Sequence, residues 1–124
     1  MVREWACSSF IKNIDTNKYN VTVISDNLYF LYTPLLTFQI THEINTLEHI
    51  TDINSNIKYD KNIVKDIDFK NKKILMNNSK EEYDYLILCH GVDVNTFNIE
   101  GISKHTYFLK THNDVLNIKK NYLN

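Results

Sequence analysis

The residues best placed for chemistry come directly after the first apolar stretch of the chain. Val21, Val23 and Ile24 form a β-branched run of the kind found in parallel sheets that are covered on both faces. Strands of such sheets present their ligand contacts just beyond their carboxyl ends, which here are Ser25 and Asp26. We therefore predict a ligand-contacting strand end at Ser25 and Asp26, with an ordinary turn at Asp26 as the alternative.

Three histidines offer metal-ligand or acid–base chemistry. His42 and His49 are seven positions apart, so a helix would place them on one face near Glu43 and Glu48. A zinc site needs more ligands than this pattern supplies, so solvent-exposed histidines are the favoured interpretation. His90 follows a second apolar stretch, but no residue is placed to orient it as a general base. We predict no metal site and no catalytic residue in this chain.

The two cysteines, Cys7 and Cys89, are far apart in the sequence and form no CxxC pair. This spacing argues against a disulfide framework and against a zinc site, and it fits a reducing compartment. We interpret Cys89 as a small buried apolar residue and not as a thiolate nucleophile.

Length and composition indicate one domain with its own core, because the chain has 124 residues of which 43% are hydrophobic. A net charge of -1 gives no reason to expect nucleic acid or an anionic membrane surface as a partner. No apolar run approaches the roughly 20 residues needed to cross a bilayer. The opening residues also lack the features of a secretory signal or a transit peptide.

The elements that must position these residues can be predicted from local patterns. A helix is expected over 5–14, and Thr33 and Pro34 are expected to be the N-cap and first residue of another. Thr111 and Asp114 form a capping box at the start of a last helix. A further helix is expected over 43–53, and strands over 19–25, 57–59, 63–68, 73–77, 83–89 and 107–109, with a hairpin turn at 69–72.

Three segments together resemble the flavin-binding part of the type II NADH:quinone oxidoreductases. They are WACSSFIKNIDTNKYNVTVIS at 5–25, NLYFLYTPLL at 27–36 and YDYLILCHGVDVNTFNIEGISKHTYFLK at 83–110. The match is colinear over nearly the whole chain, and Thr-Pro-Leu-Leu and Asn-Thr-Phe are its most specific pieces. The resemblance implies an α/β fold: a partial doubly wound (Rossmann-like) FAD-binding domain without its first central strand, and with a small β-hairpin or meander insertion.

The resemblance also implies an FAD site. Ser25 and Asp26 correspond to positions that hold the adenosine ribose. Gly91 corresponds to a point where backbone passes close to the cofactor, which glycine permits because it has no Cβ. The positions where the family's loop approaches the flavin ring correspond to Thr33, Pro34 and Leu35.

In the family, FAD takes a hydride from NADH and passes electrons to ubiquinone without proton pumping. The resemblance therefore implies an oxidoreductase bound peripherally to the mitochondrial inner membrane, with NADH and a quinone as partners. The chain as given is expected to be one partial FAD/NAD(P)-binding domain over 1–124, without the NADH-binding and membrane-associating regions. On its own it is expected to be inactive.

The sequence departs from the family pattern at the turn that would approach the pyrophosphate of FAD. Alignment on Trp5 places Val2, Glu4 and Cys7 at the small positions of the GxGxxG turn. Glu4 would add bulk and negative charge beside a dianionic group, so we expect FAD binding by this chain alone to be poor. The absent central strand would lie between residues 19–25 and 83–89. We therefore expect either that the chain is poorly folded or that these two strands pair directly with each other.

Two other interpretations remain open from the sequence. The chain could be a decayed, non-enzymatic remnant or a small interaction module. It could instead belong to another flavoprotein, such as a sulfide:quinone oxidoreductase or a relative of the flavin-dependent disulfide reductases. The Asn-Thr-Phe and Thr-Pro-Leu-Leu segments and the absence of redox cysteine spacing disfavour this last interpretation.

Overall fold

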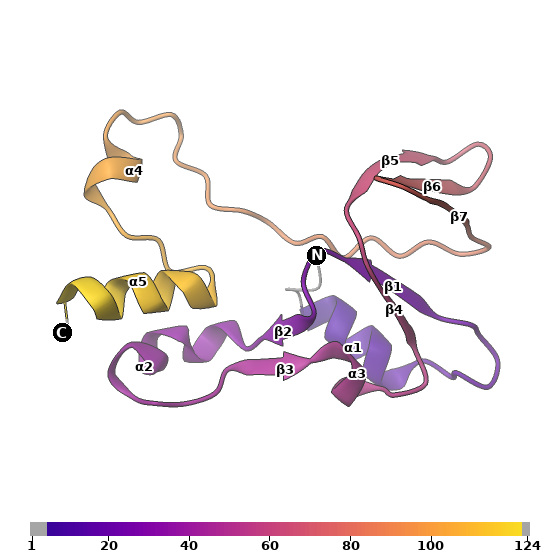
Figure 1. Ribbon diagram of the computed structural model, residues 1–124, viewed down its shortest axis with the longest axis horizontal. Coiled ribbons are helices and arrows are strands. Elements are labelled where there is room, and N and C mark those ends of the chain that lie inside the picture. Colours follow the sequence, from indigo (N-terminus) through magenta and orange to yellow (C-terminus); the bar gives the residue numbers. More distant parts are fainter. Residues whose placement is uncertain (1–4, 123–124) are drawn as a thin grey trace. The chain divides into compact units, whose positions relative to one another are not determined.

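The structure is a computed structural model that describes residues 5–122 (Figure 1). By its contacts the chain divides into two units. The first comprises Met1–Phe30 and His49–Gly91, and the second comprises Leu31–Glu48 and Val92–Asn124.

A short parallel sheet and a helix form the centre of the first unit. Strand β1 (Thr22–Ser25) pairs in parallel with β4 (Lys58–Lys61). Helix α1 (Trp5–Asn13) confirms the first predicted helix, and α3 (Ile50–Ile53) is a single short turn. The buried cluster that joins these elements consists of Cys7, Ile11, Val23, Ile50 and Ile57. An α-helix packed on parallel strands confirms the α/β prediction for this part of the chain.

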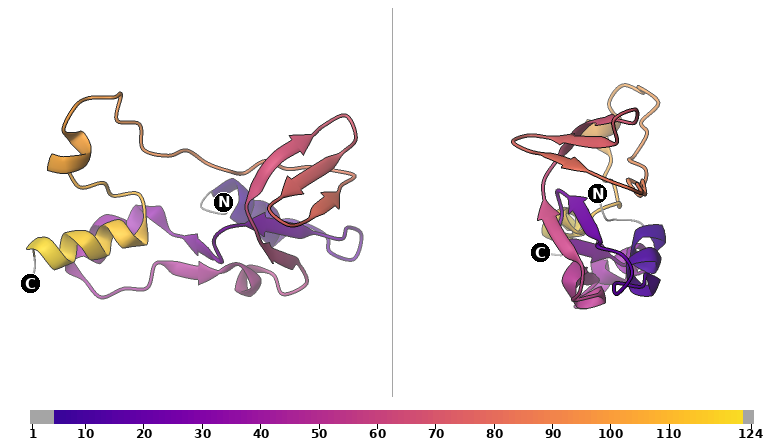
Figure 2. Two further views of the ribbon diagram at one scale, coloured as in Figure 1. Left: turned by 45° about the horizontal axis from the view of Figure 1, so that its top comes forward. Right: turned by 90° about the vertical axis from the view of Figure 1, so that its right-hand side faces the viewer.

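A three-stranded antiparallel meander follows in the same unit (Figure 2). It consists of β5 (Val64–Asp68), β6 (Lys73–Met76) and β7 (Lys80–Glu82). Asp68 is opposite Lys73 in the register, and Lys72 in the turn has a φ of 51°, so the predicted hairpin turn is confirmed. The meander matches the predicted insertion, although β7 was not expected from the sequence.

Helices dominate the second unit. A 3-10 turn, η1 (Thr33–Leu35), leads directly into α2 (Leu36–Thr41), and α4 (Ile102–His105) and α5 (His112–Tyr122) follow near the end of the chain. Leu31, Leu36 and Val115 form the buried cluster of this unit. The chain changes unit within β2 (Tyr29–Leu31), within its paired strand β3 (Leu47–His49), and again between Gly91 and Val92. Within residues 5–122, no helix is long and apolar enough to cross a membrane.

The capping box that opens α5 is confirmed. The Thr111 hydroxyl accepts a hydrogen bond from the Asp114 amide at 3.2 Å. One carboxylate oxygen of Asp114 accepts in return from the amides of Lys110 at 2.9 Å and Thr111 at 2.6 Å. The last helix therefore begins where the sequence predicted, because its start depends on residues within one turn.

Asp114→Ala is expected to destabilise α5 by about 1–2 kcal/mol, because two amides lose their acceptor at the helix start. Amide hydrogen exchange across residues 110–116 measures this as faster exchange in the variant. Asp114→Asn is the matched control, since its amide oxygen keeps an acceptor and should retain most of the protection. Equal exchange in Asp114→Ala and the unaltered chain would contradict this assignment.

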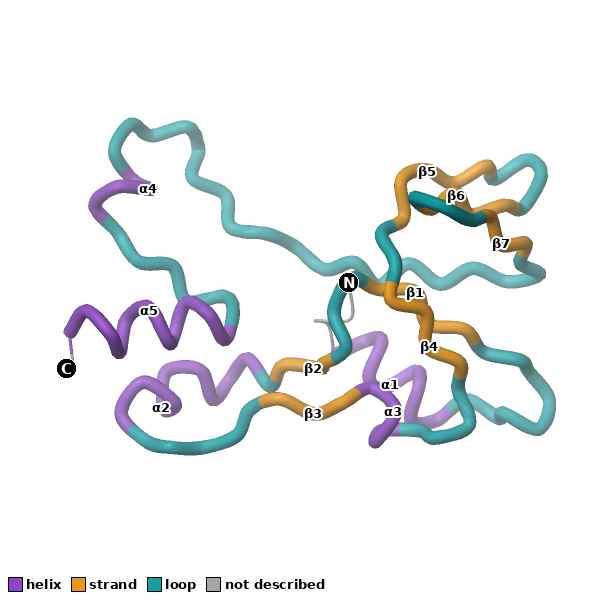
Figure 3. Tube along the Cα trace, viewed as in Figure 1, coloured by secondary structure: helices purple, strands orange, loops and turns teal. Residues whose placement is uncertain are grey.

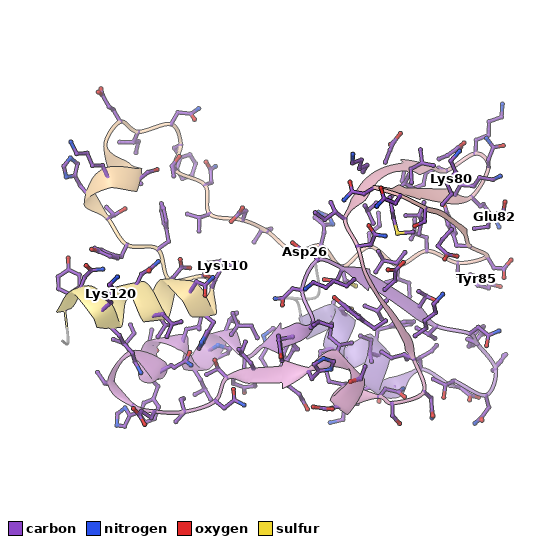
Figure 4. The ribbon with its side chains drawn as sticks, in the orientation of Figure 1. Asp26, Lys80, Glu82, Tyr85, Lys110 and Lys120 are labelled. Atoms are coloured by element: carbon purple, nitrogen blue, oxygen red, sulfur yellow. The ribbon has the colours of Figure 1, made fainter. Side chains whose placement is uncertain are left out.

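The predicted strand at residues 83–89 is wrong for this structure. The segment belongs to a long loop that runs from β7 to α4 (Figure 3). Three of its apolar side chains are exposed, with Tyr85 at 82%, Ile87 at 51% and Leu88 at 55% (Figure 4). Within the described residues β1 pairs with β4 alone, so direct pairing of β1 with 83–89 is also wrong. A sequence that suits a buried strand does not form one without a neighbouring strand to bond.

Three smaller predictions are also wrong. The helix expected over 43–53 is replaced by β3 and α3, and residues 107–109 form no strand. Thr33 is not an N-cap, because η1 begins after Tyr32 and has no side-chain cap. Apolar spacing over a few residues does not distinguish a helix from a strand followed by a turn.

Candidate dinucleotide site

Ser25 lies at the carboxyl end of β1, where its backbone is fixed by its neighbours. It is 2% exposed, and its hydroxyl accepts a hydrogen bond from the Asn27 amide at 3.1 Å. Its carbonyl accepts from the Tyr59 hydroxyl at 2.9 Å and from the Asn62 amide at 3.1 Å. The strand end is therefore held in one conformation by groups from β4 and the turn that follows it.

Asp26 follows Ser25 and is exposed (Figure 4). A carboxylate in this position can accept hydrogen bonds from sugar hydroxyls beyond the end of the strand. Asp26 is thus the exposed residue of the pair, whereas the Ser25 hydroxyl accepts a hydrogen bond within the turn.

Tyr59 is a site residue that the sequence analysis missed. It lies opposite Val23 in the parallel register, and its side chain reaches forward to the Ser25 carbonyl. Burial raises the pKa of the Tyr59 phenol. The hydrogen bond with Ser25 lowers this pKa in part, and the negative charges of Asp26 and Asp60 raise it further. The phenol is therefore kept protonated. No local sequence signal reveals its role, since that depends on the register between two strands that are distant in the sequence.

Gly91 has a φ of 67° and is half-buried in the first unit. This left-handed conformation is strained for residues with a Cβ, and it leaves the backbone open to close approach. The conformation agrees with the predicted role of Gly91, although the role itself stays a prediction.

Thr33, Pro34 and Leu35 form η1 in the second unit. Leu36 directly after them is buried, at 2% exposure, and fixes the turn against the core of that unit. Pro34 and Leu35 are exposed, with Leu35 at 40%. Two exposed apolar side chains on a rigid turn can contact a flat aromatic ring, as the predicted role near the flavin requires.

The histidines are not arranged on one helical face. His42 follows α2 and stacks on the Phe38 ring at 3.7 Å between centroids. His49 precedes α3, and its ring accepts a hydrogen bond from the Thr51 amide. Among residues 5–122 no group of three His, Cys, Asp or Glu side chains could hold a metal ion. No helix spans His42 and His49, so the single face that a helix would have given them does not form.

Each unit, taken by itself, has groups whose chemistry suits one part of FAD. In the first unit, Asp26 has an exposed carboxylate that can accept hydrogen bonds from ribose hydroxyls. In the second unit, Pro34 and Leu35 present apolar surface that suits the isoalloxazine ring. The first turn of α1 carries no acidic residue that would repel a pyrophosphate. Val2 and Glu4, at the predicted glycine positions, lie outside the described residues.

Residues 5–123 match the family described as pyridine nucleotide-disulphide oxidoreductase. The chain belongs to that family. Its fold is therefore the Rossmann-like α/β FAD-binding fold that the sequence analysis predicted.

Curated relatives of this chain support the narrower resemblance to the type II NADH:quinone oxidoreductases. The external alternative NAD(P)H-ubiquinone oxidoreductase B2, mitochondrial, of Arabidopsis thaliana is 34% identical over 94% of this chain and 23% of its own length. The external NADH-ubiquinone oxidoreductase 2, mitochondrial, of Saccharomyces cerevisiae is 32% identical over 93% of this chain and 24% of its own length. The predicted resemblance to type II NADH:quinone oxidoreductases is thus confirmed.

Solved structures are also similar to this chain. The NDH2 of Plasmodium falciparum in complex with NADH is 35% identical, with a TM-score of 0.82 over 92% of this chain and 26% of that one. A sulfide:quinone oxidoreductase of Aquifex aeolicus is 21% identical with a TM-score of 0.76, which shows the shared fold alone. The chain spans about a quarter of the length of these curated and solved relatives.

Proposed function

We propose that this chain supplies the adenosine side and the ring side of the FAD site in an NADH:quinone oxidoreductase. In the whole protein, FAD would accept a hydride from NADH and pass the electrons to a quinone. Asp26 would hold the ribose, Ser25 would shape the turn beside it, and Gly91 would let the backbone approach the cofactor. Thr33, Pro34 and Leu35 would border the ring.

The observation that carries the proposal is the fixed end of β1. The Tyr59 hydroxyl and the Asn62 amide hold the Ser25 carbonyl, and the Asp26 carboxylate extends from that strand end into solvent. An exposed acid beyond the carboxyl end of a parallel strand is the usual position for a ribose ligand in a dinucleotide fold. In a family of flavin enzymes this favours the adenosine end of FAD.

The remaining parts of the proposal rest on the relatives. Because relatives of this chain are named as external mitochondrial enzymes, we place the whole protein peripherally on the mitochondrial inner membrane. NADH and a quinone would be its partners. Residues 1–124 would form a single partial FAD/NAD(P)-binding domain that contains both contact units.

Titration of the chain with FAD and, separately, with FMN tests the proposed role of Asp26. FAD is expected to bind weakly and better than FMN, because FMN lacks the adenosine that Asp26 would hold. Asp26→Asn is expected to weaken FAD binding about tenfold, the size of one lost charge-assisted hydrogen bond. Flavin fluorescence and its polarisation measure both affinities.

Asp52→Asn is the matched control, since Asp52 is an exposed acid in α3 of the same unit. It should leave FAD affinity unchanged. Equal affinity for FAD and FMN, or an Asp26→Asn chain that binds FAD as the unaltered chain does, would contradict the assignment of Asp26 to the ribose.

A further inference from the structure

The fold brings the two cysteines together, although the sequence separates them widely. Cys7 lies in α1, and Cys89 lies in the loop just before Gly91. Both belong to the first unit and both are free thiols. Cys89 packs against the buried cluster that contains Cys7 and Ile11, and it lies near enough to Cys7 to raise the pKa of that thiol.

The two thiols differ in their exposure to solvent. Cys7 is 8% exposed, whereas Cys89 is half-buried. Burial raises the pKa of Cys7 to about 11, and the neighbouring Cys89 adds to this shift. A soluble oxidant therefore meets Cys89 first, while Cys7 is shielded from solvent and reacts only with a partner that touches it.

The segment that carries Cys89 can move toward α1. Residues 83–91 take part in no strand pairing within the described part of the chain, so no ladder of backbone hydrogen bonds fixes Cys89 in place. The sulfurs of a disulfide must approach to about 2 Å, and a segment without strand pairing can allow that approach at little cost.

We propose that Cys7 and Cys89 are a redox modification site, which a hydroperoxide closes into an intramolecular disulfide. In the first step the Cys89 sulfur attacks the peroxide, gives a sulfenic acid and releases the alcohol or water. In the second step the Cys7 sulfur attacks that sulfenic sulfur, forms the S–S bond and releases water. The two sulfurs lose two electrons in total, and these reduce the peroxide O–O bond.

This site differs from a redox pair of the CxxC type, since a helix contributes one sulfur and a distant loop the other. It does not depend on flavin binding. Closure would fix α1 to the segment just before Gly91, which restricts the unfolded chain across most of its length.

Oxidation of the 124-residue chain with hydrogen peroxide, in native buffer and at low protein concentration, tests the proposal. After alkylation of the remaining thiols, mass spectrometry is expected to show a monomer that has lost both thiols and two hydrogens. Its digest should contain one peptide pair joined through Cys7 and Cys89. Thermal unfolding of this species should have a midpoint higher by about 10 °C, and dithiothreitol should reverse the shift.

Single variants distinguish the two steps. Cys7→Ala should accumulate a sulfenic acid on Cys89, which dimedone traps, because the resolving thiol is absent. In Cys89→Ala the only remaining thiol is Cys7, which is shielded from solvent. Its oxidation should be at least tenfold slower than the oxidation of Cys89 in Cys7→Ala.

Three outcomes would overturn the proposal: both thiols remain alkylatable after peroxide, the disulfide joins two chains, or Cys89 proceeds to the sulfinic acid while Cys7 stays free. A reaction that is equally fast in guanidinium chloride would also overturn it, because the folded contact would then contribute nothing.

Discussion

Ile11→Ala is expected to unfold the first unit of this chain. Ile11 is fully buried at the centre of the cluster between α1, β1 and α3, and its carbonyl accepts a hydrogen bond from the Asn54 side chain at 3.0 Å. Removal of a buried isoleucine beyond its Cβ costs about 2–5 kcal/mol. Total stabilities of small domains are about 5–15 kcal/mol, so a chain of low stability loses most of its folded population. Urea unfolding followed by circular dichroism measures the loss.

Ile63→Ala provides the matched control. Ile63 is 55% exposed and lies just before β5 in the same unit, so the same substitution should change the free energy of unfolding by less than about 0.5 kcal/mol. If Ile63→Ala and Ile11→Ala had equal effects, the cluster around Ile11 would not be the core of the first unit.

A strand supplied ahead of α1 is expected to stabilise the chain and to order residues 83–89. The change replaces residues 1–4 with an apolar β-branched strand and a Gly-x-Gly-x-x-Gly turn. In a doubly wound fold this strand lies beside β1 and can pair on its other side with 83–89. Pairing would remove the exposed apolar side chains of 83–89 from water, so the free energy of unfolding should rise by several kcal/mol.

Amide hydrogen exchange measures this result residue by residue. Residues 85–89 are expected to exchange quickly in the chain as given and to become protected once the strand is present. A matched extension with the same composition in scrambled order, which has no strand pattern, should protect nothing. Fast exchange of 85–89 in the extended chain would contradict the doubly wound arrangement.

Local signals predicted the elements that depend on neighbouring residues. The apolar spacing of α1, the Thr111–Asp114 capping box and the turn before β6 each involve a few consecutive residues, and all three are confirmed. The strand at 83–89 was predicted wrongly because its pattern suits a buried position, while strand formation needs a partner. The helix over 43–53 was predicted wrongly because the same spacing suits β3 followed by a short turn.

In the candidate site, too, local patterns predicted only what depends on neighbouring residues. The position of Ser25 and Asp26 could be predicted from a recognisable strand, which ends at Ser25, while their contact with a ligand stays a prediction. Tyr59 could not, because its contact with the Ser25 carbonyl depends on the register between β1 and β4. The contact between Cys7 and Cys89 was equally hidden, since only the folded chain brings α1 and the loop before Gly91 together.

The most direct test of the FAD-site assignment is the flavin content of the chain after a strand and glycine-rich turn have been supplied ahead of α1. Purified with FAD and freed of excess flavin, this protein is expected to remain yellow and to hold FAD in a one-to-one ratio. Its Asp26→Asn variant should lose flavin faster during the same washing. A folded, strand-extended protein that emerges colourless would contradict the assignment of this chain to an FAD site.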